Sequence, residues 1–326
     1  MKKTLGKILS SIYGVVVALW RASYRWFPSR KKRVGARVIS VGNITWGGTG
    51  KTPLTAKLAQ CLTDEGKKVA VLTRGYGKDE VQELRKKIPG IPVIVGRDRV
   101  RTAREAVEKH GAEILILDDG FQHLRLHRDR DIVILNCTEP FGPGGLLPLG
   151  TLREPLNELK RADMFVLTKC DIGSKNVHWI RQKLNALKPN ATIFEAIHRP
   201  LGLSDPVKKR RMDLSGLRGK KIAALSGIGD PYSFEKTVEF LGGEILLAAR
   251  FEDHHEFRES DILKFAEQCT KAGLHEAVTT EKDFFRMASI LEKHAHKSLQ
   301  SFTFWVLEIE FQVCDEEDFV RRCINS

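Results

Sequence analysis

Apolar residues from position 34 onward fall into short, nearly continuous runs that alternate with stretches of helical spacing. Between the first two runs, apolar residues recur at helical intervals from Thr52 to Glu65, as the buried face of a helix requires. Strands that are apolar on both faces and separated by helices are typical of a parallel sheet covered on both sides. We therefore expect an α/β fold with a doubly wound, mostly parallel sheet. The runs are ARVISVGN, KKVAVLTRGY, IPVIVG, EILILDD, DIVILN, MFVLTK and TIFEAI.

A second series of apolar runs follows the basic stretch DPVKKRRMDLSGLRGK. This series comprises KIAALSGI, EILLAARF, EAVTTEKD and FTFWVLEIEF. The interruption predicts a boundary near Leu214, between a larger domain of residues 34–214 and a smaller α/β domain of residues 215–326.

The first 33 residues have a different pattern, with an apolar segment from Ile12 to Trp20 among basic and aromatic residues. Trp20, Tyr24 and Phe27 share one face of a predicted helix, and Arg21 and Arg25 follow another. Aromatic side chains at headgroup level and cations on anionic lipid are typical of a helix that lies in a membrane interface. We interpret residues 1–33 as a basic, amphipathic, membrane-associating helix.

Other interpretations of this segment are a membrane span, a signal peptide and a core helix. The apolar run is short for a membrane span, which needs roughly 20 residues, although a single-pass anchor stays open. RASYRWFPSRKKR lacks the small residues of a signal-peptide cleavage site. A core helix with a solvated basic end is the alternative that involves no membrane. If the segment is an anchor, deleting residues 1–27 is expected to reduce membrane association more than the ligand affinity of the rest of the chain.

Charge and cysteine content narrow the class of protein. The net charge is +13, and residues 1–33 hold nine Lys or Arg and no Asp or Glu. A basic excess at one end favours an anionic membrane surface over a nucleic-acid groove, so we expect no nucleic-acid partner. The six cysteines are scattered without a C-x-x-C pair, which indicates a reducing cytoplasm, no zinc site and no disulfide framework. No obligate protein partner is indicated.

The stretch VGNITWGGTGKTP has the features of a phosphate-binding loop between a strand and a helix. Glycine amides converge on phosphate oxygens, Lys51 reaches the β and γ oxygens, and the Thr52 hydroxyl is a Mg²⁺ ligand. Thr45 stands where the usual motif has its first glycine, and the glycines are shifted toward the helix. The predicted nucleotide-binding residues are Thr45, Trp46, Gly47, Gly48, Thr49, Gly50, Lys51 and Thr52.

A second group of polar residues follows the strand EILILDDG. Asp118 and Asp119 lie at its carboxyl end, where ligands bind in open α/β sheets, and one of them is expected to hold Mg²⁺ as a Walker-B aspartate does. Gln122 and His123 come next and are placed at the rim of the same cleft. His123 has two interpretations, a phosphate ligand or proton shuttle and a structural histidine.

The segment MFVLTKCD supports a rival function. Its last four residues resemble the [NT]-K-x-D guanine-recognition pattern of P-loop GTPases. Together with the basic helix, this pattern raises the hypothesis of a GTP-binding, membrane-recruited switch protein. A membrane scaffold that binds no nucleotide is a third hypothesis. Neither explains the remaining motifs.

Several motifs together resemble the tetraacyldisaccharide 4′-kinase family over nearly the whole chain. They are the basic–aromatic N-terminal helix, VGNITWGGTGKTP, TRGYG, DDGFQHLRL, LPLGTLREP, DHH and TEKD. The resemblance implies that the γ-phosphoryl group of ATP, with Mg²⁺, is transferred to the 4′-hydroxyl of a tetraacylated glucosamine disaccharide 1-phosphate, the lipid A precursor. It also implies a small domain that closes over the cleft, and a location on the cytoplasmic face of the bacterial inner membrane, peripheral or N-terminally anchored.

The resemblance also implies roles for particular residues. The family's base is an Asp in a G-D-E-P motif, assisted by a His of the second domain. Asp79 and Glu80 align with D-E, although this chain lacks the flanking Gly and Pro, and His254 in FEDHHEF is the matching histidine. Asp79, His254 and Lys51 are thus the expected catalytic residues, and Glu80 joins the expected metal ligands. Further residues that match family motifs are Arg153, Glu154, Glu281, Lys282 and Asp283.

Arginines in GRDRVRTA add one more candidate contact with the substrate. Arg97, Arg99 and Arg101 are spaced so that they could bind the 1-phosphate of the disaccharide. A solvated basic face explains the same pattern equally well.

Overall fold

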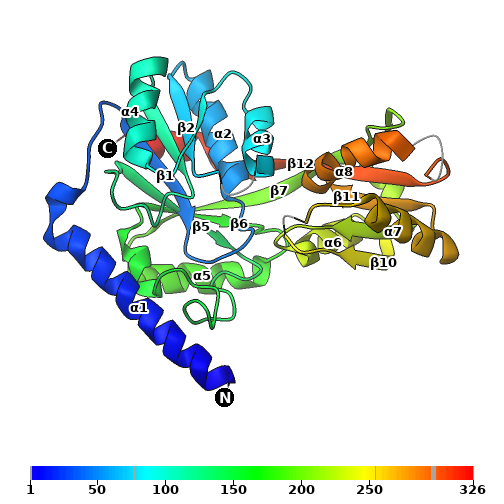
Figure 1. Ribbon diagram of the computed structural model, residues 1–326, viewed down its shortest axis with the longest axis horizontal. Helices are drawn as coiled ribbons and strands as arrows, with labels where there is room; N and C mark the ends of the chain where they lie inside the picture. Colours follow the sequence, from blue (N-terminus) through cyan, green and yellow to red (C-terminus); the bar gives the residue numbers. More distant parts are fainter. Residues whose placement is uncertain (1, 76–77, 254, 295–298, 326) are drawn as a thin grey trace. The chain divides into compact units, whose positions relative to one another are not determined.

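The computed structural model describes residues 2–75, 78–253, 255–294 and 299–325, and only the backbone of residues 2–5, 78–80 and 294. Contacts divide the chain into two compact units (Figure 1). Unit 1 comprises Met1–Ile197 and Phe311–Ser326, and unit 2 comprises His198–Glu310. The chain passes from unit 1 to unit 2 within strand β7 (Thr192–Asp205) and returns within β12 (Thr303–Val313).

Unit 1 is built on a parallel sheet with the strand order β7-β6-β5-β1-β4-β2-β3. This confirms the doubly wound α/β fold that the apolar runs predict. Because β1 lies between β4 and β5, the chain winds outward in both directions from the strand that carries the phosphate loop. Its strands besides β7 are β1 (Arg37–Asn43), β2 (Val69–Thr73), β3 (Val93–Val95), β4 (Ile114–Asp118), β5 (Arg130–Asn136) and β6 (Met164–Thr168).

Helices cover both faces of this sheet, as continuous apolar strands require. On one face Ile39 of β1 packs with Leu58 of α2 (Lys51–Asp64) in a cluster that α3 (Lys78–Lys87) and α9 (Glu316–Ile324) complete. On the other face, the neighbouring Val38 packs with Ala103 of α4 (Arg99–His110). Helix α5 (Ser174–Leu187) and the short helix η2 (Leu156–Arg161) cover the strands toward β7.

Unit 2 is a smaller α/β layer with the parallel strand order β10-β9-β11-β12. A short strand, β8 (Arg210–Met212), pairs antiparallel with the end of β7. Two apolar clusters lie on opposite faces of these strands. The other elements are β9 (Lys221–Ser226), α6 (Pro231–Phe240), β10 (Glu244–Arg250), α7 (Glu259–Lys271), β11 (Glu276–Thr280) and α8 (Glu281–His294).

The boundaries of the two compact units differ from those of the domains 34–214 and 215–326 that the apolar pattern predicts. The chain already enters unit 2 at His198, in the middle of a strand. The last helix, α9, belongs to unit 1 because Phe319 and Cys323 pack in the core beside α2. The pattern of apolar runs assigns this segment to the second domain by its place in the chain and does not show which core it joins.

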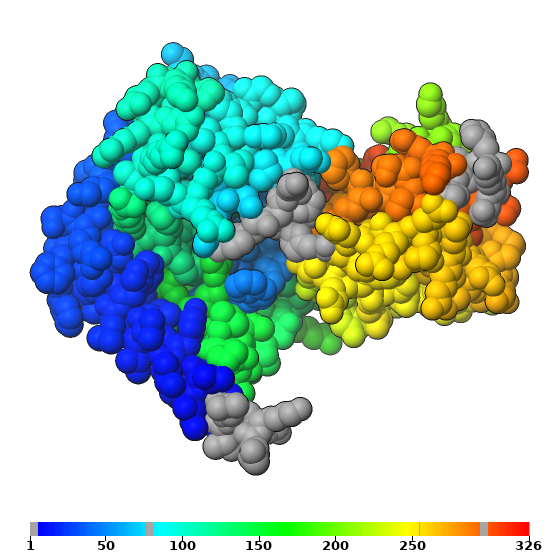
Figure 2. Space-filling model, in the orientation of Figure 1, coloured from blue at the N-terminus to red at the C-terminus, as the bar shows by residue number. Residues whose placement is uncertain are grey.

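Helix α1 (Lys2–Trp26) belongs to unit 1 and has one face exposed and one against the rest of that unit (Figures 1 and 2). The exposed face is apolar and includes residues more than half exposed. Two sequence-based placements are wrong: Tyr24 is only 9% exposed, and Arg21 forms ion pairs with Glu154 and Glu158 instead of facing lipid. Among the described residues, no helix has the length and apolarity that a bilayer crossing needs. The exposed apolar residues are Ile8, Leu9, Ile12, Val15, Val16, Leu19, Trp20 and Trp26.

Candidate active site

The predicted phosphate loop connects β1 to α2 at the carboxyl edge of the unit 1 sheet. Helix α2 begins at Lys51, one residue before the helical spacing that the sequence shows from Thr52, and the first N–H groups of a helix have no partner within it. Gly47 and Gly50 have φ values of 120° and 93°, a region in which a side chain would strain the backbone. The loop therefore brings amide donors and the positive end of a helix dipole to one point, which is a site for an anion.

Other parts of the sheet hold this loop in place. The Trp46 amide donates to the Thr151 carbonyl at 2.7 Å, so it is engaged within the protein. The Thr168 hydroxyl donates to the Thr49 carbonyl at 3.0 Å, and Asn43 Nδ2 donates to Thr49 Oγ1 at 2.9 Å. The buried Thr45 forms a β-bridge to the same segment that accepts the hydrogen bond of the Trp46 amide. Trp46 itself is 67% exposed. Thr45, Trp46 and Thr49 thus shape the loop through contacts inside the protein.

Asp119 forms the charged centre of the site. Its φ of 54° turns it away from the line of β4, and its Oδ1 lies 2.6 Å from Arg153 Nη1 and 4.0 Å from Lys51 Nζ. Burial raises the pKa of Asp119, but the charges of Lys51 and Arg153 outweigh burial and hold that pKa below its ordinary value. Asp119 is therefore an anion that orients two cations beside the phosphate loop.

Asp118, the last residue of β4, has a different environment. Its carboxylate is 7% exposed and accepts hydrogen bonds from the hydroxyls of Thr55 and Thr73 at 3.3 and 3.4 Å. Thr55 lies one turn after Thr52 on α2, so the expected Mg²⁺ ligand of the loop and Asp118 share one side of the helix start. Carboxylate and hydroxyl oxygens suit Mg²⁺, which needs few protein ligands when substrate phosphates supply others. Asp118 and Thr52 fit the ion better than Asp119, which Arg153 engages.

Arg99 supports the backbone of the site and does not have the exposed position that a contact with the 1-phosphate needs. It is 3% exposed, and its guanidinium donates to the carbonyls of Gly96 at 2.7 Å and Asp118 at 3.3 Å. The alternating arginines of GRDRVRTA therefore do not form one phosphate-binding face, because Arg99 points inward while Arg97 and Arg101 are exposed. Arg99 fixes the backbone that carries the two aspartates.

Gln122 and His123 follow Asp119 in a tight turn that packs on the end of β1. A Cβ at Gly42 would lie 2.6 Å from Phe121, so only glycine lets this turn come so close. Gln122 Nε2 donates to the Asn43 carbonyl at 2.9 Å. The partly exposed His123 has a buried Nε2 without a hydrogen-bond partner among the described residues. Burial, with the charges of Arg99 and Arg128, lowers its pKa to about 4, so His123 is neutral near pH 7.

The lowered pKa of His123 makes a prediction for stability against pH. The unfolded chain takes up a proton at His123 below its ordinary pKa of 6.5, whereas the folded chain does so only near pH 4. Folding stability is therefore lost as the pH falls from about 6.5 to 4. The variant His123→Gln should have a shallower loss in this window, measured by denaturant unfolding at several pH values. His275→Gln, at an exposed position, is the control, and equal slopes for both variants would contradict the prediction.

The R-E motif lies at the junction of several elements. Arg153 donates from Nη1 to Asp119 and also to Asn43 Oδ1 at 3.2 Å. Glu154 is 1% exposed and accepts two hydrogen bonds from Arg161 Nη2, at 2.8 and 2.7 Å. The Arg161 guanidinium lies over the Phe121 ring, 3.5 Å from its centroid. Glu154 is thus an interior anchor, whereas Arg153 reaches the charged centre.

In unit 2 the TEKD motif spans the end of β11 and the start of α8. Asp283 is fully buried and accepts hydrogen bonds from the Gly227 amide at 3.0 Å and the Thr280 hydroxyl at 2.7 Å. Lys282 Nζ lies 3.3 Å from Asp253 of the DHH motif, so the two motifs meet within this unit. Asp283 therefore organises the turn, Lys282 tethers the DHH segment, and Glu281 is the first residue of α8.

The expected base and its partner lie at the edge of what the structure describes. Asp79 and Glu80 are in the first turn of α3, where only the backbone is described, and His254 lies outside the described residues. The chain approaches α3 from Thr73, whose hydroxyl contacts Asp118, so this segment leaves the sheet beside the site. The neighbouring His255 pairs with Asp261 at 3.1 Å and stacks on Phe251. The described residues contain no group of three or more metal-ligating side chains.

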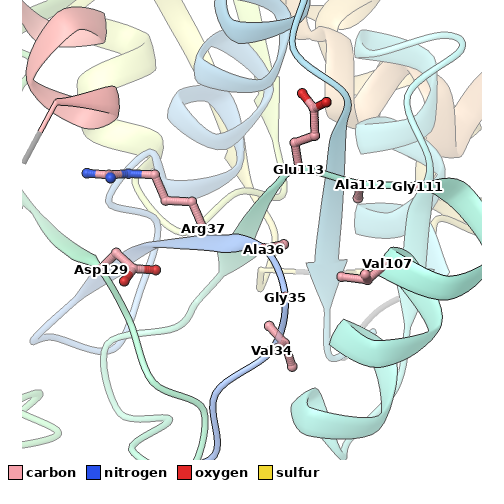
Figure 3. A pocket seen from close by; sticks show the side chains of 9 residues that line it. All are labelled: Val34, Gly35, Ala36, Arg37, Val107, Gly111, Ala112, Glu113 and Asp129. Atoms are coloured by element: carbon pink, nitrogen blue, oxygen red, sulfur yellow. The ribbon is translucent and has the colours of Figure 1, made fainter.

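Two hollows in unit 1, of about 500 and 380 Å³, lie away from this chemistry. The larger one is at the amino ends of β1 and β4, opposite the edge that carries the phosphate loop (Figure 3). Its polar side chains are engaged, since Arg37 Nε donates to the Cys323 carbonyl at 3.1 Å and Asp129 Oδ2 accepts from the Val38 amide at 2.8 Å. We place the candidate site at the carboxyl edge, where the charged groups converge.

Some residues of the site have no counterpart among the sequence-based predictions. Asn43 supports Thr49, Gln122 and Arg153, and its position as a polar residue at the end of an apolar strand is a signal that would have found it. Thr168, assigned above to a guanine-recognition pattern, donates a hydrogen bond from its hydroxyl to the Thr49 carbonyl of the loop. Arg161 was not predicted either, because its contact with Phe121 joins residues 40 positions apart, although its partner Glu154 is near in sequence.

Known proteins match the chain over its whole length. The model of the tetraacyldisaccharide-1-P 4′-kinase (LpxK) family matches residues 2–86 and 79–325. The tetraacyldisaccharide 4′-kinase of Syntrophus aciditrophicus is 38% identical over 96% of this chain and 90% of its own. A probable mitochondrial tetraacyldisaccharide 4′-kinase of Arabidopsis thaliana is 36% identical over 94% of this chain and 85% of its own.

A solved structure agrees with these matches. The crystal structure of LpxK from Aquifex aeolicus in complex with ATP aligns with a TM-score of 0.71 and 26% identity, and covers 100% of both chains. Fold, motifs and sequence identity therefore agree across the full chain. The protein belongs to the tetraacyldisaccharide 4′-kinase family.

Proposed function

We propose that the chain transfers the γ-phosphoryl group of ATP to the 4′-hydroxyl of a tetraacyl glucosamine disaccharide 1-phosphate, which gives the 4′-phosphorylated product in lipid A biosynthesis. The observation that carries this proposal is the charged centre at the phosphate loop, where Asp119 lies between Lys51 and Arg153. In a chain of this family, such a centre suits the transfer of a phosphoryl group. The acceptor follows from the family.

The residues of the loop act chiefly by position and charge. The amides of Gly48 and Gly50 and the start of α2 are placed to bind phosphate oxygens, and Asp119 orients Lys51 toward the same point. Thr52 and Asp118 would hold Mg²⁺, which supplies charge neutralisation on the nucleotide when bound. Arg153 adds a second cation, so negative charge that develops during transfer meets preorganised donors.

Asp79 is proposed as the base that accepts the proton of the sugar hydroxyl, with His254 as its partner. A carboxylate is a weak base for an alcohol, so its role is to accept a proton that moves late, and an imidazole nearby would orient it. The start of α3 after Thr73 supports a place for Asp79 close to Asp118. Glu80 is proposed as a further metal ligand from the adjoining position.

A direct assay tests the reaction. Purified full-length protein is incubated with γ-labelled ATP, Mg²⁺ and detergent-solubilised tetraacyldisaccharide 1-phosphate, and the lipid product is analysed for a phosphate at the 4′ position. Label transfer to that position is the expected result. A folded chain that binds ATP but labels no lipid would sink the proposed reaction. Competition with GTP tests the rival switch, which requires a strong preference for GTP over ATP.

We further propose that α1 places the enzyme on an anionic membrane surface, at the cytoplasmic face of the bacterial inner membrane. The apolar stripe of α1 supports this, since Val15, Val16 and Leu19 are each more than half exposed. Arg25 and Lys31 are exposed near the end of the helix and suit anionic headgroups. The acceptor is itself a lipid, so such docking brings the site to its substrate.

Substitution on the stripe should weaken membrane binding. The double variant Val15→Asn and Leu19→Gln loses two apolar side chains from the interface, which should lower partition onto vesicles by roughly tenfold or more. Cosedimentation with vesicles that contain anionic lipid measures this effect. Phe240→Gln, which alters a 90% exposed phenylalanine outside α1, is the control and should bind as the parent does. Equal loss in both variants would speak against a specific role of α1.

A further inference from the structure

The face of α1 that is turned toward unit 1 carries polar and small residues in specific contacts. Ser10 Oγ donates to the Leu146 carbonyl at 2.7 Å, and Tyr13 Oη donates to the Arg153 carbonyl at 2.9 Å. At Gly14 a Cβ would lie 2.9 Å from the Leu146 side chain, so the helix backbone comes close to this segment. Such contacts are unlike those of a tether that only carries an anchor, because they are directional and partly buried.

Ion pairs add to these hydrogen bonds between α1 and the rest of unit 1. Arg21 Nε lies 3.4 Å from Glu154 Oε2, and the same guanidinium contacts Glu158. Glu154 is 1% exposed and has Arg161 as its other cationic partner. Because a buried carboxylate is costly without its charged partners, loss of Arg21 would leave Glu154 with Arg161 alone. Burial raises the pKa of Tyr13, so its hydroxyl stays protonated and able to donate.

The segment that α1 holds is also the segment that supports the phosphate loop. The Arg153 amide donates to the Ile44 carbonyl at 2.8 Å, and the Trp46 amide donates to Thr151 at 2.7 Å. The Arg153 side chain then reaches Asp119, which lies beside Lys51. Residues 151–154 therefore contact α1 through the Arg153 carbonyl and the Glu154 carboxylate. Toward the nucleotide loop they offer the Arg153 amide and the Thr151 carbonyl, and the Arg153 guanidinium reaches Asp119 beside the loop.

We propose that Tyr13 and Arg21 are positioning residues of the ATP site, so that α1 is a structural part of the phosphate loop's support as well as a membrane-docking helix. They act through residues 151–154, which set the loop backbone and the place of Arg153 against Asp119. This inference rests on the proposed use of ATP but not on the identity of the acceptor. It revises the sequence-based expectation that loss of residues 1–27 affects ATP affinity less than membrane binding.

The test measures ATP binding by the full chain in detergent micelles, without lipid substrate. Tyr13→Phe removes one hydroxyl and should weaken ATP binding about three- to tenfold in calorimetric titration, the size of one lost hydrogen bond. Arg21→Gln should weaken it more, and Arg21→Lys should recover part of the loss because the charge returns. Hydrogen exchange at the Trp46 and Arg153 amides should accelerate in Tyr13→Phe, since these amides hold the loop.

A control variant separates this effect from membrane docking. Leu19→Gln alters the exposed face of α1, so it should lower vesicle binding and leave ATP affinity within about twofold of the parent. If Tyr13→Phe and Arg21→Gln bind ATP as the parent does, with unchanged exchange at Trp46, the inference is wrong. A lower thermal midpoint without a change in ATP affinity likewise contradicts it. A parent chain that binds ATP but phosphorylates no lipid refutes the proposed reaction and leaves this inference intact.

Discussion

Replacing Lys51 by alanine should lower phosphoryl transfer by about a thousandfold, because the loop then lacks its cation where negative charge develops. Lys51 Nζ lies 4.0 Å from Asp119, which holds it at the loop. The loss should fall mainly on turnover, measured as labelled lipid formed at saturating ATP. Lys51→Arg should recover little, since a planar guanidinium does not match the position of a compact ammonium.

A second lysine of the same helix provides the control for Lys51. Lys57 lies further along α2 and pairs with Glu316 at 2.9 Å, so Lys57→Ala removes a lysine from the helix without altering its start. This variant should keep nearly full turnover. A Lys51→Ala enzyme as active as Lys57→Ala would refute the assignment of the phosphate loop, and it would leave the nucleotide-free scaffold as the surviving hypothesis.

Replacing Asp79 by asparagine should lower turnover by roughly 10² to 10⁴, the range expected for loss of a general base, and should spare ATP binding. An amide has nearly the shape of the carboxylate but does not accept the proton of the sugar hydroxyl. Turnover is measured by the lipid assay, and ATP affinity by calorimetric titration of the same preparation. A loss of turnover without a loss of ATP affinity would identify Asp79 as a base. A loss of ATP affinity would identify it as a nucleotide ligand.

The neighbouring carboxylate tests the register of this assignment. Asp79 and Glu80 are adjacent in the first turn of α3, in a segment that lacks the flanking Gly and Pro of the family motif. Glu80→Gln should weaken the dependence on Mg²⁺ and retain more turnover than Asp79→Asn. If Glu80→Gln loses more turnover than Asp79→Asn, Glu80 is the base. If both variants have normal turnover, neither residue takes part in the mechanism.

The division of labour between the two aspartates could not be predicted from the sequence. DDG after an apolar strand predicts two carboxylates at the carboxyl edge of the sheet, and both are there. Asp118 still follows the strand and faces Thr55 and Thr73, whereas Asp119 has left it with a positive φ and meets Arg153. The contact with Arg153 comes from a distant segment, and the periodicity of the chain carries no information about it.

Helix α1 is a second case in which the sequence pattern predicts an element but not which of its side chains are buried. Its apolar and basic pattern predicts an amphipathic helix, and the structure has one over Lys2–Trp26. The pattern also placed Arg21 and Tyr24 toward lipid, but Arg21 pairs with Glu154 and Tyr24 is buried. The hydrogen bond from Tyr13 to Arg153 joins residues 140 positions apart, so no local pattern could predict which charges of the helix are internal.

The sequence by itself determined the order of the main strands, the start of α2 to within one residue and the edge of the sheet that carries the predicted phosphate loop. These follow from the periodicity of apolar residues and from the conformations that glycine allows, which are properties of neighbouring residues. The tertiary structure decided which carboxylate meets which cation and how α1 joins the support of the phosphate loop. Those outcomes depend on burial and on contacts between distant segments, and these exist only when the chain is folded.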